Sequence, residues 1–148
     1  MAVLKGEENL LNLTEGSNST KRVLKSNEKS SVFLYFSDHG APGFLLLPND
    51  SVYADELNET ISYMFEKKMY KEFVIFLEAC ESGSMFKHFD LGVMNAYALT
   101  ATNETNPSFG TYCYPHDVVK DEHLYTCLGD LFSVNWMQYI EENSIKLS

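Results

Sequence analysis

The chain has 148 residues, 45% of them apolar, which suits one globular domain with its own hydrophobic core. Asp and Glu outnumber Lys and Arg by 21 to 11, so the formal net charge is −10 at pH 7 with neutral histidines. This charge argues against nucleic acid or an anionic membrane surface as the main partner, because both require a basic face. No apolar run approaches the roughly 18 residues that a membrane span needs.

The first part of the chain offers little to a core. Residues 1–11 are mildly apolar, and we expect a short strand or a helical turn there. They lack the basic-then-apolar pattern of a signal peptide. Residues 12–31 are rich in Asn, Ser, Thr, Lys and Glu, which predicts a surface loop.

Five Asn-x-Ser/Thr triplets, the acceptor pattern for N-glycosylation, indicate a protein that passes through the secretory route. They begin at Asn12, Asn18, Asn49, Asn58 and Asn103. These triplets disagree with the missing signal pattern. We therefore expect the natural N-terminus to lie upstream of this sequence.

The middle of the chain begins with a strand and a helix. Residues 31–36, SVFLYF, form a continuous apolar, aromatic and β-branched run, which predicts a strand buried on both faces. A Gly- and Pro-containing turn follows over residues 37–43, and residues 44–48 are expected to form a short return strand. In residues 54–70 apolar side chains recur near helical spacing, with acids early and lysines late, which predicts a helix.

Two further apolar runs complete the predicted sheet. Residues 73–77, FVIFL, indicate a second buried strand, and residues 96–101 a third. A loop to about residue 126 and a helix over residues 128–142 are expected to follow. Strand, helix, strand and strand in this order predict an α/β fold with a mainly parallel sheet covered by helices. In such sheets functional groups collect beyond the carboxyl ends of the strands.

His39 and Cys80 each follow one of these strands, so the prediction places an imidazole and a thiol at the same edge. A thiol nucleophile needs a base to take its proton and N–H donors to hold the oxyanion. His39 can supply the base, and Gly40 lets the backbone approach a substrate closely. The alternative is that His39 is a turn residue and Cys80 a small buried hydrophobe.

The sequence around these residues closely resembles the legumain family of asparaginyl endopeptidases, called vacuolar processing enzymes in plants. The matching blocks are YFSDHGAPG, LEACESGSMF, DELNETISYMFEKKMYK, YALTATNE, FGTYC and YTCLGDLFSVNWM. The likeness runs from about residue 2 to residue 137. Several blocks in the right order and spacing are far more specific than one His-Gly pair.

The resemblance implies a caspase-like α/β fold and a thiol peptidase that cleaves after asparagine, and more weakly after aspartate at low pH. It makes Cys80 the nucleophile and His39 the general acid/base. The backbone N–H groups of Gly40 and Cys80 become the oxyanion hole. No cofactor and no metal are implied.

The resemblance also implies a specificity pocket next to the thiol. Glu78, Ser108 and Asp130 match residues that line the primary pocket, where carboxylates accept from the amide N–H₂ of an asparagine side chain. Asp38 matches an aspartate linked in some relatives to a peptide-joining side activity. Without the resemblance, Glu78 would be interpreted as a helix-capping or salt-bridged acid.

Cys113 and Cys127 enclose His116 and His123, and this spacing by itself allows zinc ligation, a disulfide or two free thiols. Plant-type relatives carry a cysteine pair in the same TYC…TCLGD context. The resemblance therefore implies a disulfide between Cys113 and Cys127.

Residues 1–148 match the central part of the family's catalytic domain, and residues 138–148 depart from its pattern. The family's signal peptide, first strand and helix, and C-terminal prodomain have no counterpart in this sequence. Neither do an asparagine that supports the histidine and an Arg-His pair of the pocket. We expect a partial catalytic domain in which residues 31–36 form an exposed sheet edge.

The expected partners are proteins or peptides with exposed asparagine, and cystatin-type inhibitors. The expected location, taken from the full-length relatives, is lysosomal, vacuolar or secreted. Two alternative functions remain. One is an inactive paralogue that binds peptides, and the other is a relative of the transamidase that attaches lipid anchors.

Overall fold

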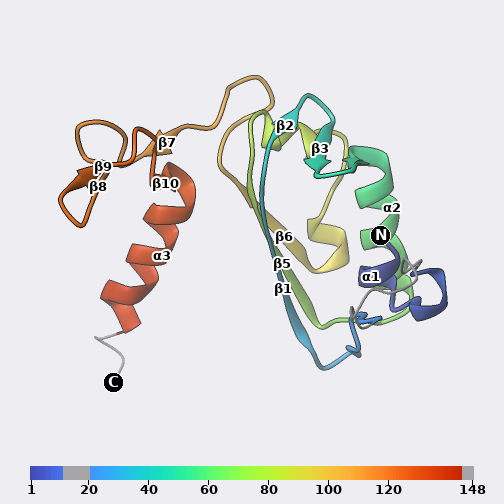
Figure 1. Ribbon diagram of the computed structural model, residues 1–148. Coiled ribbons are helices and arrows are strands. Elements are labelled where there is room, and N and C mark those ends of the chain that lie inside the picture. The colour runs from blue at the N-terminus through green and yellow to red at the C-terminus, as the bar shows by residue number, and fades with distance from the viewer. Residues whose placement is uncertain (12–20, 145–148) are drawn as a thin grey trace.

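A parallel sheet of three strands lies at the centre of the protein, as the sequence predicted. The computed structural model describes residues 1–11 and 21–144, so the predicted glycosylation sites Asn12 and Asn18 lie outside the described residues. The strands, in spatial order, are β1 (Ser31–Ser37), β5 (Glu72–Glu78) and β6 (Ala96–Thr100). Figure 1 shows α1 and α2 on one side of this sheet and α3 on the other.

The helices are α1 (Ala2–Lys5), α2 (Ala54–Glu66) and α3 (Leu131–Ser144), with short 3₁₀ turns at η1 (Glu8–Leu10), η2 (Ser82–Phe86) and η3 (Gly92–Met94). The helical turn expected near the N-terminus and both longer helices are confirmed. α2 ends at Glu66, short of the predicted limit, because Lys68 has a left-handed backbone with φ of 53°.

Within residues 1–11 and 21–144, three small antiparallel sheets accompany the central one. The first consists of β2 (Gly40–Ala41), β3 (Phe44–Leu47) and β4 (Asp50–Tyr53), and it contains the predicted return strand. The second pairs β7 (Gly110–Thr111) with β10 (Gly129–Asp130), and the third pairs β8 (Val118–Val119) with β9 (Glu122–His123). The sequence predicted only a loop across β7 to β9, because strands of two residues carry no periodic pattern.

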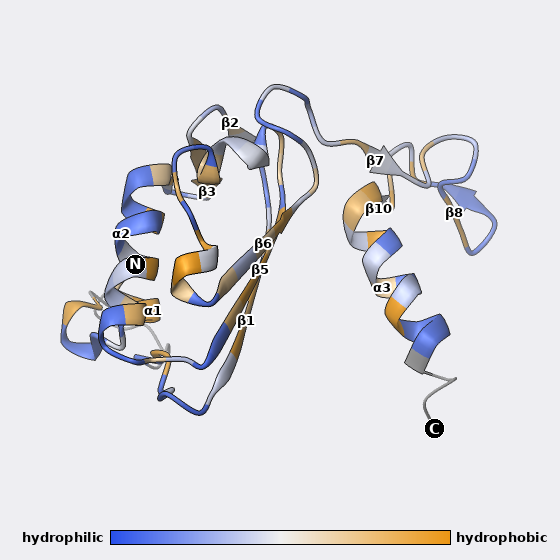
Figure 2. Cartoon of the chain, turned by 180° about the vertical axis from the view of Figure 1, so that it is seen from behind, coloured by the Kyte–Doolittle hydropathy of each residue, from blue (hydrophilic) through white to orange (hydrophobic). Residues whose placement is uncertain are grey.

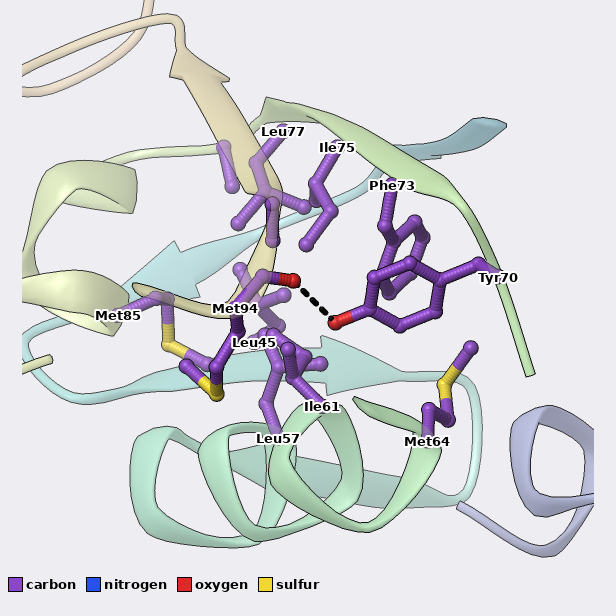
Figure 3. Close-up of a cluster of buried hydrophobic side chains, with 12 residues drawn as sticks. Leu45, Leu57, Ile61, Met64, Tyr70, Phe73, Ile75, Leu77, Met85 and Met94 are labelled. Atoms are coloured by element: carbon purple, nitrogen blue, oxygen red, sulfur yellow. Dashed lines mark hydrogen bonds between the residues drawn. The ribbon is translucent and has the colours of Figure 1, made fainter. Parts of the chain in front are cut away.

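The hydrophobic core lies between α2 and β5. Leu57, Ile61 and Met64 recur at helical spacing on one face of α2, and each is at most 2% exposed. They meet alternate residues of β5, of which Phe73, Ile75 and Leu77 are buried (Figure 3). The apolar residues are concentrated along the central strands (Figure 2). This core fixes the face of β5 and therefore the direction in which its last residues leave the sheet.

The opposite face of the sheet is covered only in part, and the prediction that β1 is buried on both faces is wrong. β1 is an edge strand, which confirms the exposed sheet edge expected for residues 31–36, and Phe33 and Tyr35 are 54% and 39% exposed. Trp136 of α3 packs edge-on against this face, with its ring centroid 5.6 Å from that of Tyr35 and 5.4 Å from that of Phe76. Aromatic side chains of α3 therefore cover only part of this face, where the sequence predicted a complete layer of helices.

No helix within the described ranges is long and apolar enough to cross a membrane.

The core predicts a large cost for shortening a β5 side chain. Ile75 is fully buried, so Ile75→Ala leaves a cavity and is expected to lower the free energy of unfolding by about 2–5 kcal/mol. Urea denaturation followed by circular dichroism measures this change. The matched control is Ile140→Ala on α3, where the side chain is 51% exposed and we expect a change within about 0.5 kcal/mol. Equal losses in the two variants would contradict this account of the core.

Candidate active site

The carboxyl ends of β1 and β5 coincide and bring two distant segments together. Ser37 is the register partner of Glu78, and the backbone N–H of Asp38 donates to the Glu78 carbonyl over 3.2 Å. The residues that follow are His39 after β1 and Cys80 after β5. The sheet thus places the imidazole and the thiol at one edge, as parallel topology predicts.

Gly40 allows these two segments to approach each other. A Cβ atom at Gly40 would lie 2.6 Å from the Cys80 carbonyl oxygen and 3.0 Å from the Cβ of Ala79. The first distance is too short for a side chain unless the backbone shifts, and the second is tighter than most Cβ contacts. Glycine at position 40 is therefore needed for the close approach of the two backbone segments. The His39 carbonyl accepts from the N–H of Leu46 over 2.9 Å, which anchors the turn on β3.

Cys80 is a free, half-buried cysteine at a sharp reversal of the chain. Glu81 follows it in a left-handed conformation with φ of 48°, which a residue with a side chain adopts at a cost. The N–H of Glu81 donates to the Asn106 carbonyl over 2.9 Å and holds the reversal in place. The backbone N–H of Ser108 donates to the Cys80 Sγ over 3.3 Å, so the sulfur faces a partial positive charge.

His39 is exposed, and a hydrogen bond holds its backbone but not its imidazole ring. The Oδ1 of Asp38 accepts from the His39 backbone N–H over 2.7 Å. Within residues 1–11 and 21–144, no hydrogen bond to the imidazole ring is present. The ring is therefore free to turn toward a bound molecule.

A cavity of about 440 Å³ opens at this edge of the sheet. Six of the residues singled out in the sequence line it together with Ser37 and Ala79: Asp38, His39, Glu78, Cys80, Ser108 and Asp130. A larger hollow of about 630 Å³ has a different lining, with Glu81, Ser84 and Lys87 among its residues. The smaller cavity is the candidate active site because it joins the thiol, the imidazole and the carboxylates.

Glu78 is buried at 2% exposure, and its carboxylate accepts three hydrogen bonds. The Oγ of Ser108 donates to Oε1 over 2.6 Å. The N–H and the Oγ of Ser133 donate to Oε2 over 2.7 and 2.8 Å. Ser133 in turn lies 2.7 Å from the phenol oxygen of Tyr35. Sequence reasoning missed Ser133 and Tyr35, since nothing in their local pattern marks a residue that meets Glu78 from another element.

Asp130 is on the short strand β10 and lines the same cavity as Glu78; the residue as a whole is exposed. Partial burial of its carboxyl group raises the pKa of Asp130 above its usual value, and the negative charge of Glu78 raises it further, against an opposing effect of His39. Asp130 therefore keeps its proton to a higher pH than an ordinary aspartate. It then presents a neutral hydrogen-bond donor to the cavity at acidic pH.

Cys113 and Cys127 form a disulfide that closes the loop before α3, as the resemblance implied. A Cβ at Gly110 would lie 2.9 Å from the Cys127 Sγ, so glycine makes room for the bridge. The zinc alternative is wrong for these cysteines because their sulfurs are bonded to each other. Among the residues that the structure describes, no three His, Cys, Asp or Glu side chains are arranged to hold a metal ion.

The same loop contains a buried carboxylate. Asp117 is fully buried and accepts from the Nδ1 of His123 over 2.7 Å and from the N–H of Tyr125 over 2.6 Å. Burial alone would raise the pKa of Asp117. The hydrogen bonds from His123, from Tyr125 and from the backbone N–H of Asp117 itself, together with the charge of His123, lower this pKa below its usual value. The hydrogen bond between Asp117 and His123 gives the disulfide loop a second internal link.

The described glycosylation candidates differ in accessibility. Asn49 and Asn103 are exposed. Asn58 is 8% exposed inside α2, and its Nδ2, the atom that would carry a glycan, donates to the Met85 carbonyl over 3.2 Å. In the folded protein the Asn58 side chain is therefore poorly accessible, and glycosylation at this triplet stays a prediction.

Comparison with known proteins gives a family and several relatives. The model of the peptidase C13 family matches residues 1–148. The protein named legumain from Mus musculus is 46% identical over 138 residues, which are 93% of this chain. The hemoglobinase of Schistosoma mansoni is 44% identical over 78% of the chain, and the vacuolar-processing enzyme delta-isozyme of Arabidopsis thaliana 42% over 79%. The chain spans 25–29% of the length of these relatives.

The contact between Gly40 and Cys80 predicts that a single methyl group disturbs the site. Gly40→Ala forces the His39 turn away from the Cys80 carbonyl and is expected to lower the free energy of unfolding by about 1–3 kcal/mol. It should also change the rate at which iodoacetamide alkylates Cys80. The control is Gly92→Ala, where the new Cβ approaches only the side-chain oxygen of Asp90, at 3.2 Å. If Gly40→Ala matched the parent in both measurements, the close approach would be refuted.

Proposed function

Because the chain belongs to the peptidase C13 family, we propose that it supplies the catalytic centre of a cysteine endopeptidase that cleaves after asparagine. The observation that carries this proposal is the cavity in which Cys80, His39 and the carboxylate of Glu78 meet. Legumain relatives support the thiol chemistry, and the cavity's polar lining supports the choice of an asparagine side chain.

The proposed reaction begins when His39 takes the proton of the Cys80 thiol and the thiolate attacks the carbonyl of the peptide bond. The N–H groups of Gly40 and Cys80 hold the oxygen on which negative charge develops. His39 then returns the proton to the leaving amine, and a thioester to Cys80 remains. A water molecule, deprotonated by His39, hydrolyses the thioester and regenerates the thiol.

The acids next to Cys80 do not oppose this chemistry. The carboxylate of Glu78 is directed to the two serine hydroxyls and the Ser133 N–H, not to the sulfur. The sulfur accepts from the backbone N–H of Ser108 over 3.3 Å. Glu78 therefore serves recognition, and Ser108 contacts both the Glu78 carboxylate and the Cys80 sulfur.

Recognition of asparagine follows from the acceptor that remains on Glu78. A carboxylate offers about four lone-pair positions, and three are occupied by the two serines. The remaining position, on Oε1, accepts one N–H of the substrate's carboxamide. A substrate carboxylate in the same place meets a like charge, so asparagine is preferred over aspartate near neutral pH.

The proposed setting follows the relatives. We assign to the whole protein a role in protein processing or degradation in a lysosome or vacuole, with cystatin-type inhibitors as regulators. The residues that the structure describes supply the dyad and one wall of the pocket.

Peptide binding without turnover is a second candidate function. The observation that favours it is the imidazole ring of His39, which lacks a hydrogen bond among the described residues. A ring without a partner is not held in the orientation that proton transfer requires.

Cleavage of a fluorogenic peptide with asparagine before the scissile bond, at about pH 5.5, tests the dyad. Cys80→Ala is expected to abolish turnover, and His39→Ala to reduce kcat by roughly 10²–10⁴-fold. His88→Ala, an exposed histidine outside the cavity, is the matched control and should behave as the parent. Turnover that survives Cys80→Ala rules out the dyad, whereas peptide binding without any turnover favours the second candidate.

The raised pKa of Asp130 predicts how cleavage after aspartate depends on pH. Its raised pKa keeps it neutral at acidic pH, and it gains a negative charge that repels a substrate carboxylate as the pH rises. Cleavage after aspartate relative to asparagine should therefore fall with increasing pH. Asp130→Asn removes this charge and should raise the ratio at pH 6.5 by roughly tenfold. The exposed Asp121→Asn is the control, and an unchanged ratio in Asp130→Asn would refute the assignment.

A further inference from the structure

Glu78 is held from the side of the sheet opposite the core. Tyr35 comes from β1 and Ser133 from the first turn of α3, so two elements distant in sequence converge on one carboxylate. Figure 1 shows α3 on the side of the sheet away from α2. Ser133 is 5% exposed, and its hydroxyl has neighbours on both sides.

The hydrogen bonds in this chain have one consistent direction. Glu78 as a carboxylate only accepts, so the hydroxyl proton of Ser133 points to Oε2. The Ser133 oxygen is then left with its lone pairs, and the phenol of Tyr35 donates to it over 2.7 Å. Tyr35 therefore supports this orientation of the Ser133 hydroxyl by donating to its oxygen, and acts on Glu78 only through Ser133.

We propose that Tyr35 and Ser133 are positioning residues that orient the Glu78 carboxylate for a neutral carboxamide side chain. This inference rests on the function proposed above. With Oε2 held by Ser133, rotation of the carboxylate is restricted, and one acceptor position remains on Oε1. Both Glu78 and Ser108 line the cavity. Selectivity for asparagine thus depends on a phenol that lies outside the cavity lining.

The ring of Tyr35 allows a clean removal of its hydroxyl. It packs edge-on against Trp136 with centroids 5.6 Å apart and planes at 65°. Tyr35→Phe keeps this aromatic contact and deletes only the donor to Ser133. Tyr97→Phe is a matched control. Tyr97 is the register partner of Val74, which is the register partner of Phe33, so Tyr97 lies on the same face of the sheet as Phe33 and Tyr35. Its side chain is 60% exposed.

The test compares kcat and KM for two peptides that differ only in asparagine or alanine before the scissile bond. In Tyr35→Phe we expect the preference for asparagine in kcat/KM to fall about fivefold, through KM, with kcat changed less than twofold. Ser133→Ala should reduce the preference further, and Tyr97→Phe should leave it unchanged. The rate at which iodoacetamide alkylates Cys80 should remain at the parent's value in Tyr35→Phe, which a general loss of structure would not allow.

The outcomes separate this inference from the function on which it rests. If the parent prefers asparagine, and Tyr35→Phe shows the same preference as Tyr97→Phe, the positioning role alone is overturned and the proposed function stands. If the parent cleaves neither peptide, calorimetric binding of the uncleaved asparagine and alanine peptides provides the same ratio. A parent that neither cleaves nor binds asparagine selectively overturns the proposed function and this inference together.

Discussion

The parallel pairing of β1 with β5 is the constraint on which the candidate site depends. Because Ser37 and Glu78 are register partners, the residues after both strands leave the sheet at the same level. A slip of one residue would turn Glu78 to the other face and separate the His39 turn from Cys80. The register itself is held by the burial of Phe73, Ile75 and Leu77 against α2. The core of the protein therefore positions the site, and of the buried apolar side chains of the core only Ala79 lines the cavity.

The two faces of the sheet have different tasks. One face is packed against α2 and stabilises the fold, as the almost complete burial of Ile61 and Ile75 shows. The other is partly open, and there α3 brings Ser133 to Glu78 and Trp136 to the aromatic residues of β1 and β5. A buried carboxylate without such donors would be costly, so the contacts that stabilise Glu78 also fix its direction. Stability and recognition are coupled at this one residue.

Local sequence patterns predicted those strands and helices that depend on residues close to one another in the chain. The apolar runs gave the three strands of the central sheet, and the helical spacing of Leu57, Ile61 and Met64 gave α2. Placement of His39 and Cys80 at one edge followed from the topology, although their roles came from the family resemblance. The exposure of Phe33, the contact of Tyr35 with Ser133 and the burial of Asn58 were not predictable. Each depends on which element packs against a residue across the fold, and the sequence carries no local signal for that.

Covalent labelling with an asparagine-bearing peptidyl electrophile tests the central claim most directly, because it needs both the thiol and the pocket in one place. Mass spectrometry after digestion locates the adduct, and a matched electrophile with alanine in place of asparagine measures selectivity. The account predicts an adduct on Cys80 that forms much faster with the asparagine probe and disappears in Cys80→Ala. Labelling at equal rates with both probes, or an adduct on another residue of the folded chain, would contradict it.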